Sequence, residues 1–185
     1  MRKGGIGGAN TLTGLAFEGL MDLSTFISML NGYTLLESPN KKGKSTYQDI
    51  FYKENLVGQV FQKYGLYNFL ESESVDWSTV WSKKILPDDA LFVILNNKVF
   101  IIEKKYQETE GSVDEKLQTC DFKKKQYKKL FALLNIDVEY VFILSKWYTA
   151  PKYKDSLDYV ISVGCHYYFD YIPFNIFGLP LPEEI

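Results

Sequence analysis

The sequence predicts an α/β fold with a mixed central β-sheet flanked by helices on both faces. Two observations support this prediction. Apolar, β-branched runs at 91–95, 99–102 and 138–144 are typical of buried strands, and amphipathic stretches with apolar residues three and four positions apart lie before and after them. A chain of 185 residues is long enough for one domain with a substantial apolar core. We therefore expect residues 1–185 to form a single domain.

Composition and charge exclude several classes of protein. Hydrophobic residues make up 46% and charged residues 24% of the chain, which argues against a disordered or fibrous protein. The apolar runs are too short for a membrane span, and Glu18 and Asp22 interrupt the N-terminal run, so we expect a cytoplasmic protein without a signal peptide. Two cysteines and one histidine are too few for a disulfide framework or a zinc cluster. Any chemistry must therefore depend on carboxylates, amines and hydroxyls.

The first third of the chain is expected to contain two helices and a short strand. Apolar residues from Leu12 to Leu30 recur at helical spacing, and Asn31-Gly32 provides a stop signal. Pro39 and Gly43 lie in a polar stretch that is typical of a loop. The elements expected before residue 65 are a helix over 11–30, a strand over 33–36, a loop over 37–46 and a helix over 49–64.

A β-hairpin is expected in the middle of the chain. The runs Leu91–Leu95 and Val99–Ile102 are joined by Asn96-Asn97, and asparagine tolerates the positive φ angles of a two-residue turn. With these two residues as the loop, Leu95 pairs with Lys98. This pairing sets the register of every later residue along the two strands.

The predicted register brings charged residues together at the open end of the hairpin. Asp88 faces Lys105, and alternation of side chains places Glu103 on the same face, while Asp89 and Lys104 lie on the other. Two carboxylates and an amine within about 5–8 Å suit a hard divalent cation such as Mg²⁺, which prefers oxygen ligands. The alternative is two cross-strand salt bridges, Asp88 with Lys105 and Asp89 with Lys104, worth about 0.2–1 kcal/mol each.

The last third of the chain is expected to alternate between helix and strand. Ser112 to Glu115 has the pattern of a capping box, and the apolar repeat that follows is broken at Lys124. The elements expected after the hairpin are a long helix from 112 to 134, a strand over 138–144, a short helix over 153–159, a strand over 159–163 and a strand over 166–172.

The hairpin carries a recognisable motif. Pro87-Asp88, followed fifteen residues later by Glu103-Lys104-Lys105 and then by a helix, resembles the PD-(D/E)xK nuclease motif, and the chain resembles a type II restriction endonuclease. The resemblance implies that Asp88 and Glu103 bind Mg²⁺ and that Lys105 assists the attacking water. It also implies that Glu18, on an N-terminal helix, completes the site. Asp89 would replace Asp88 as the ligand if the turn were one residue longer.

The resemblance also implies a substrate and an assembly. We expect Mg²⁺-dependent hydrolysis of phosphodiester bonds in double-stranded DNA at a short specific sequence, by a homodimer that supplies two active sites. Lysines between Lys116 and Lys129 and in the loop 41–44 are candidates for phosphate contacts. The alternatives are a repair or structure-selective nuclease, the cleavage subunit of a larger restriction system, or a non-enzymatic DNA-binding or interaction domain.

Overall fold

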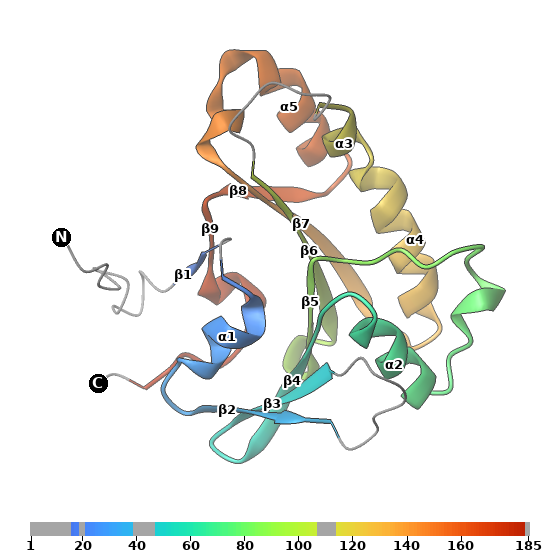
Figure 1. The fold of residues 1–185 in the computed structure, drawn as a ribbon, viewed down its shortest axis with the longest axis vertical. Coiled ribbons are helices and arrows are strands. Elements are labelled where there is room, and N and C mark those ends of the chain that lie inside the picture. Colours follow the sequence, from blue (N-terminus) through green and yellow to red (C-terminus); the bar gives the residue numbers. More distant parts are fainter. Residues whose placement is uncertain (1–15, 19–20, 39–46, 107–113, 184–185) are drawn as a thin grey trace.

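A computed structural model describes residues 16–18, 21–38, 47–106 and 114–183. Its centre is a seven-stranded mixed sheet in the order β2-β3-β4-β5-β6-β7-β8 (Figure 1). Neighbouring strands are antiparallel from β2 to β6, and β6, β7 and β8 are parallel. The expected fold class, α/β with a mixed sheet, is confirmed at this level.

The strands and helices have the following bounds. The strands are β1 Ala16–Glu18, β2 Tyr33–Glu37, β3 Tyr47–Tyr52, β4 Asn55–Phe61, β5 Asp89–Val93, β6 Lys98–Lys105, β7 Asp137–Leu144, β8 His166–Phe169 and β9 Tyr171–Pro173. The α-helices are α1 Leu23–Ser28, α2 Gly65–Ser72, α3 Asp114–Gln118, α4 Cys120–Ala132 and α5 Lys154–Ser162. In the described ranges, no helix has the length and apolar character needed to cross a bilayer.

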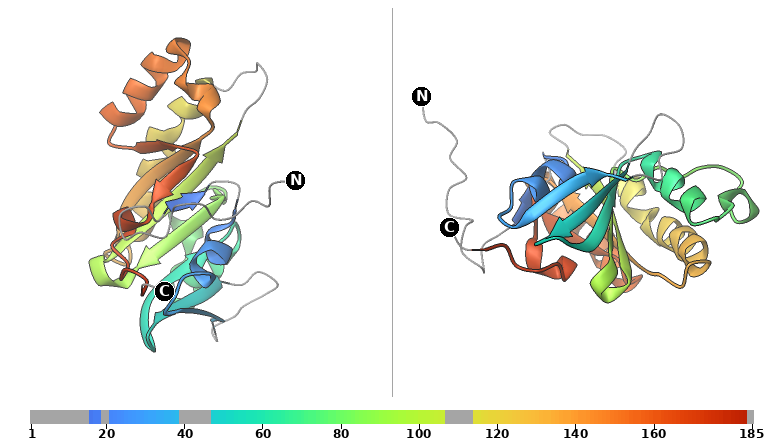
Figure 2. Two further views of the ribbon diagram at one scale, coloured as in Figure 1. Left: turned by 90° about the vertical axis from the view of Figure 1, so that its left-hand side faces the viewer. Right: turned by 90° about the horizontal axis from the view of Figure 1, so that it is seen from below.

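Alternation along the central strands builds one apolar core on each face of the sheet. On β6, Val99 and Ile101 belong to the core beneath α2, α3, α4 and α5, whereas Phe100 and Ile102 belong to the core beneath α1 and the C-terminal segment. The end-on view in Figure 2 shows α1 and α4 on opposite sides of the sheet. Each fully buried side chain of this size contributes about 1.5–3 kcal/mol. We call the two sides the α4 face and the α1 face.

The predicted helix over 11–30 is largely wrong. Residues 16–18 form β1, which pairs antiparallel with β9, so Glu18 lies opposite Tyr171 rather than on a helix. The helix α1 begins at Leu23 because the carboxylate of Asp22 accepts a hydrogen bond from the Thr25 amide (2.8 Å) and caps it. Residues 11–15, 19 and 20 lie outside the described residues.

The predicted helix over 49–64 is also wrong, because this stretch forms most of the β3–β4 hairpin. Lys53 and Glu54, which form its turn, have φ angles of 48° and 68°. Both positions of such a turn usually hold asparagine, aspartate or glycine, so the sequence carries no recognisable turn signal. Gly58 allows β4 to approach β5, since a Cβ atom there would lie 2.5 Å from the Phe92 carbonyl oxygen.

The last third of the chain follows the predictions more closely. The strand over 138–144 and the helix over 153–159 are confirmed, and Tyr33–Glu37 likewise confirms the short strand expected near the N-terminus. The strand expected over 159–163 is wrong, because α5 continues to Ser162. A positive φ of 63° at Asp170 separates β8 from β9, and Thr119 separates α3 from α4. The helix start expected at Ser112 lies outside the described residues.

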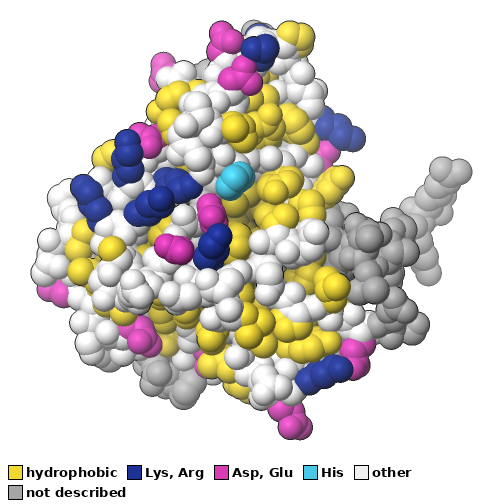
Figure 3. All heavy atoms as spheres, turned by 180° about the vertical axis from the view of Figure 1, so that it is seen from behind, with side chains coloured by type: hydrophobic (Ala, Val, Ile, Leu, Met, Phe, Trp, Pro, Cys, Tyr) yellow, Lys and Arg dark blue, Asp and Glu magenta, His cyan; other side chains and the backbone are white. Residues whose placement is uncertain are grey.

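A small cavity of about 170 Å³ lies where β6 and β7 begin. Phe100 and Val141 contribute apolar walls, and Lys98, Glu139 and His166 contribute polar ones. Both Lys98 Nζ (3.0 Å) and His166 Nε2 (3.6 Å) contact the Glu139 carboxylate. Figure 3 shows this histidine among charged and apolar side chains. The cavity lies at the opposite end of β6 from the Glu103-Lys104-Lys105 motif.

Candidate active site at the open end of the hairpin

The β5–β6 hairpin forms, but its register differs from the prediction by two residues. Val93, not Leu95, pairs with Lys98. A 3₁₀ turn over Ile94–Asn96, followed by left-handed Asn97, lengthens the loop to four residues. The side-chain Nδ2 groups of Asn96 and Asn97 donate to the carbonyls of Phe177 (3.0 Å) and Asn135 (2.7 Å), so contacts distant in sequence hold this longer turn.

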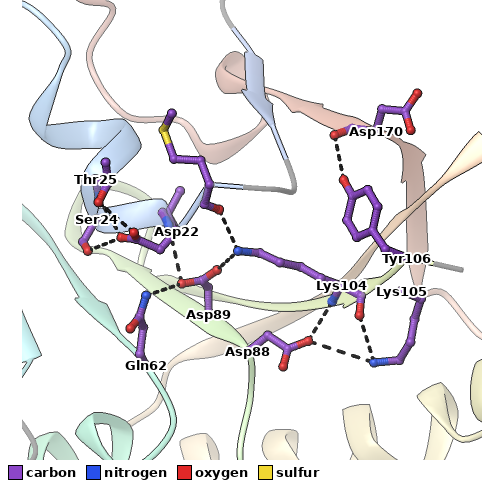
Figure 4. Close-up of polar contacts among 12 residues, drawn as sticks. Asp22, Ser24, Thr25, Gln62, Asp88, Asp89, Lys104, Lys105, Tyr106 and Asp170 are labelled. Atoms are coloured by element: carbon purple, nitrogen blue, oxygen red, sulfur yellow. Dashed lines mark hydrogen bonds and ion pairs between the residues drawn. The ribbon is translucent and has the colours of Figure 1, made fainter.

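An even shift preserves the face of every side chain, because side chains alternate with a period of two. Asp88, Glu103 and Lys105 therefore still meet on the α4 face. Lys105 Nζ lies 3.0 Å from Glu103 Oε2. It also lies 4.0 Å from Asp88 Oδ2 and 3.2 Å from the Lys104 carbonyl oxygen (Figure 4). Three oxygens from two carboxylates and the main chain thus surround one ammonium group. We call Asp88, Glu103, Lys105 and Lys123, described next, the open cluster.

Helix α4 adds Lys123, which sequence reasoning grouped only with the candidate phosphate contacts. Its Nζ lies 3.1 Å from Glu103 Oε1, so each oxygen of this buried carboxylate contacts a lysine. The spacing along the helix carried a usable signal. Lys123 lies three residues after Cys120 and four before Tyr127, both buried, and this position borders the helix face that packs on the sheet.

Main-chain and tyrosine contacts fix the position of Asp88. Its Oδ2 accepts a hydrogen bond from the Lys104 amide (2.8 Å), which ties the approach to β5 to β6. Upstream, the carbonyl of Ile85 accepts from the hydroxyls of Tyr67 (2.7 Å) and Tyr127 (3.1 Å). Burial raises the pKa of both tyrosines, so they remain protonated donors at neutral pH. Helices α2 and α4 thereby hold the segment that leads into Asp88.

A second group of residues, Asp89 with its partners Lys104 and Gln62, lies on the α1 face, and we call it the closed cluster. Asp89 is buried, with Lys104 Nζ 2.5 Å from its Oδ2. Its Oδ1 accepts from Gln62 Nε2 (3.1 Å) and from the Leu23 amide (3.5 Å) at the start of α1. Lys104 Nζ also donates to the Met21 carbonyl (2.8 Å). Both carboxylate oxygens of Asp89 are thus engaged by the protein itself, which favours Asp88 over Asp89 as a candidate ligand.

The remaining expected site residue is Glu18. It lies in β1, and the chain continues from there to Met21, whose carbonyl contacts the closed cluster. The helical position expected for Glu18 is wrong. Its participation in the site stays a prediction.

The oxygen atoms of the open cluster are suitable donors for a hard cation. Mg²⁺ in proteins commonly takes one or two carboxylates and keeps several waters, and Asp88, Glu103 and the Lys104 carbonyl supply donors of this kind. These oxygens already converge on one positive charge, the Lys105 ammonium. A metal ion bound by the same oxygens would share them with that ammonium or displace it. Within the described ranges, no group of three or more His, Cys, Asp or Glu residues could hold a metal ion.

Three consecutive lysines of α4 point in three directions. Lys123 reaches Glu103, whereas Lys124 is buried and contacts the Gly164 carbonyl and, at 3.7 Å, Glu139. Lys125 pairs with Asp121 at 2.7 Å on the exposed surface. A helix turns by about 100° per residue, which explains this divergence. The expected phosphate contacts stay a prediction for the helix, and the lysines of loop 41–44 lie outside the described residues.

Comparison with known proteins adds no assignment to this geometry. No family model matches the chain, and no match is found among curated proteins or among solved structures. The assignment of a function therefore depends on the residues of the open cluster themselves.

Proposed function

We propose that this protein is a Mg²⁺-dependent endonuclease of double-stranded DNA, of the PD-(D/E)xK type and with the role of a type II restriction enzyme. One observation carries the proposal: three oxygens, from Asp88, Glu103 and the Lys104 main chain, surround the ammonium of Lys105. A partly exposed carboxylate beside a buried one, with an amine between them, provides both cation ligands and a proton donor within reach of solvent.

Each residue of the open cluster has a distinct task in phosphodiester hydrolysis. Asp88 is partly exposed and can meet substrate and cation together. Glu103 is buried and fixed, so its carboxylate needs little reorganisation on binding. Mg²⁺, when bound, would polarise a phosphoryl oxygen and lower the pKa of a bound water. Lys105 would orient the attacking water and offset the negative charge that develops on the phosphoryl oxygens.

The restriction role brings a requirement on assembly. Cleavage of both strands at one site needs two catalytic clusters, and each chain supplies one open cluster. We therefore propose a homodimer whose twofold axis coincides with that of a palindromic DNA site. Contacts from lysines to phosphates would make binding weaken steeply with salt.

The test is incubation of the purified protein with phage-sized duplex DNA, with Mg²⁺ or with EDTA, followed by gel electrophoresis. Discrete bands that require Mg²⁺ are the expected result, and mapping their ends yields the recognition site. A Mg²⁺-dependent smear would retain the nuclease and remove the restriction role. Intact DNA under every condition would contradict the proposal. The variant Glu103→Gln, prepared in parallel, controls for a contaminating nuclease.

A further inference from the structure

The carboxylate of Glu103 is held between two lysines from different elements. Lys105 belongs to the same strand, β6, and contacts Oε2 at 3.0 Å. Lys123 belongs to α4 and contacts Oε1 at 3.1 Å. The Glu103 side chain is 4% exposed, whereas the two lysines are 21% and 27% exposed. The negative charge of this buried carboxylate is thus compensated by two partly exposed ammonium groups.

The two lysines contact different oxygens of the Glu103 carboxylate. Oε2 belongs to the group of oxygens around Lys105, together with Asp88 and the Lys104 carbonyl. Among the residues that the structure describes, Lys123 alone donates to Oε1. A hydrogen bond to one oxygen restrains rotation about the last torsion of the glutamate side chain, which is otherwise broad. Lys123 therefore keeps Oε2 directed towards Lys105 and Asp88.

Lys123 is suited to this task by its place on α4. The helix is fixed to the sheet through buried residues on either side of Lys123, among them Cys120, Tyr127 and Leu130. Its neighbour Lys124 contacts Gly164 and Glu139, and Lys125 pairs with Asp121. The three lysines therefore provide a comparison within one helix, in which the same charge is removed beside Glu103 or away from it.

Charge in the open cluster is balanced, with Asp88 and Glu103 opposite Lys105 and Lys123. Removing one ammonium leaves a net negative site, which attracts a divalent cation more strongly. The same removal frees Glu103 to rotate and makes the site less favourable for a phosphodiester, whose negative charge grows in the transition state. Loss of Lys123 should therefore raise cation affinity and lower the reaction rate.

We infer that Lys123 is a positioning residue of the site, which orients the carboxylate of Glu103 for phosphodiester cleavage at the expense of cation affinity. This inference rests on the proposed function. It assigns to α4 a direct part in the site, in addition to its part in the core.

The test compares Lys123→Met with Lys125→Met, which removes the same charge from the exposed surface of the same helix. Binding of Mg²⁺ to the free protein is measured by calorimetry, and kcat and KM are measured on duplex DNA at saturating Mg²⁺. For Lys123→Met we expect Mg²⁺ affinity to rise about three- to tenfold and kcat to fall about ten- to a hundredfold with little change in KM. Lys125→Met should keep the Mg²⁺ affinity and the kcat of the wild type, because Lys125 pairs with Asp121 and not with Glu103. Loss of a phosphate contact at Lys125 would change KM alone.

The conservative variant Lys123→Arg should recover both values to within about threefold, because arginine keeps the charge and can donate to Oε1. It also provides a test if the methionine variant fails to fold. A fall in both affinity and rate would indicate a merely structural lysine and overturn the inference, as would a Lys123→Met variant that behaves like Lys125→Met. A wild-type protein that neither binds Mg²⁺ nor cuts DNA would instead overturn the proposed function, and the inference with it.

Discussion

Two pairs of neighbouring residues, Asp88 with Asp89 and Lys104 with Lys105, are divided between two clusters on opposite faces of one hairpin. In the closed cluster the Asp89 side chain is 1% exposed and lies 2.5 Å from one lysine. In the open cluster the Asp88 side chain is 44% exposed, and Lys105 is shared with Glu103. The residue types are the same, so their surroundings decide the difference.

The comparison shows that the remaining access to solvent separates a structural ion pair from a candidate active site. Gln62, Leu23 and Lys104 use both oxygens of Asp89, which leaves it little capacity for a ligand. Such a pair joins β5 and β6 to the start of α1. The open cluster has two carboxylates and two ammonium groups and is reached from solvent at Asp88, so it can accept a cation and a substrate.

The largest effect is expected from Glu103→Gln. An amide is a poorer cation ligand than a carboxylate and replaces one acceptor oxygen with a donor, which would face Lys105 or Lys123. We expect DNA cleavage to fall at least about a thousandfold, because a bound metal contributes several kcal/mol to the transition state. Cleavage rates at saturating Mg²⁺ measure this, with circular dichroism as the control for folding. Activity within tenfold of wild type would remove Glu103 from the site.

The next largest effect is expected on the free energy of unfolding, from a substitution in the closed cluster. Lys104→Met leaves the carboxylate of Asp89 buried without its cation, which should lower the free energy of unfolding by about 3–5 kcal/mol. Urea denaturation measures this change. The double variant Asp89→Asn with Lys104→Met removes both charges and should recover at least half of the loss. If the single variant were as stable as the wild type, the closed cluster would not be a structural pair.

Lys105→Ala should affect rate without preventing binding. We expect the variant to retain affinity for its target duplex and to cut at least about a hundredfold more slowly, the scale of one preorganised electrostatic or proton-transfer group. Gel-shift affinity, measured without Mg²⁺, and single-turnover rates provide the two values. Wild-type cleavage by this variant would contradict the role given to the open cluster.

The smallest effect is expected from substitution of Glu139, a third carboxylate with several cations around it. This effect concerns the pH dependence of stability. Burial alone would raise its pKa, but the hydrogen bond from Lys98 and the charges of Lys124, Lys98 and His166 outweigh burial and lower it. Its folded pKa therefore lies below the ordinary value of 4.5. The stability it contributes is present above that value and is lost as the pH falls through the lower, folded pKa.

Melting temperatures of the wild type and Glu139→Gln, measured from neutral pH down to acid, test this sign. The wild type should be the more stable above pH 4.5, and the difference should shrink as the pH falls. Cleavage at neutral pH should be unchanged, because Glu139 lies at the other end of the sheet from the open cluster. A difference that grew on acidification would contradict the direction given for this pKa.

The sequence predicted the hairpin and the faces of its charged residues because strand alternation has a period of two. The register itself was wrong, since Asn96 and Asn97 are held by Phe177 and Asn135, far away in sequence. Residues 49–64 form a hairpin in place of the predicted helix because Lys53 and Glu54 adopt left-handed conformations, which local propensity does not reveal. Lys123 was missed as a partner of Glu103 because that contact depends on how α4 packs on the sheet.

The most direct test of the division between the two clusters is a comparison of Asp88→Asn with Asp89→Asn. Each variant is given duplex DNA and saturating Mg²⁺ at a temperature well below its melting point, and its first-order cleavage rate is compared with that of the wild type. We predict that Asp88→Asn is folded and inactive, whereas Asp89→Asn has a lower melting temperature and cuts at close to the wild-type rate. An active Asp88→Asn beside a folded but inactive Asp89→Asn would place the chemistry on the α1 face and contradict the account.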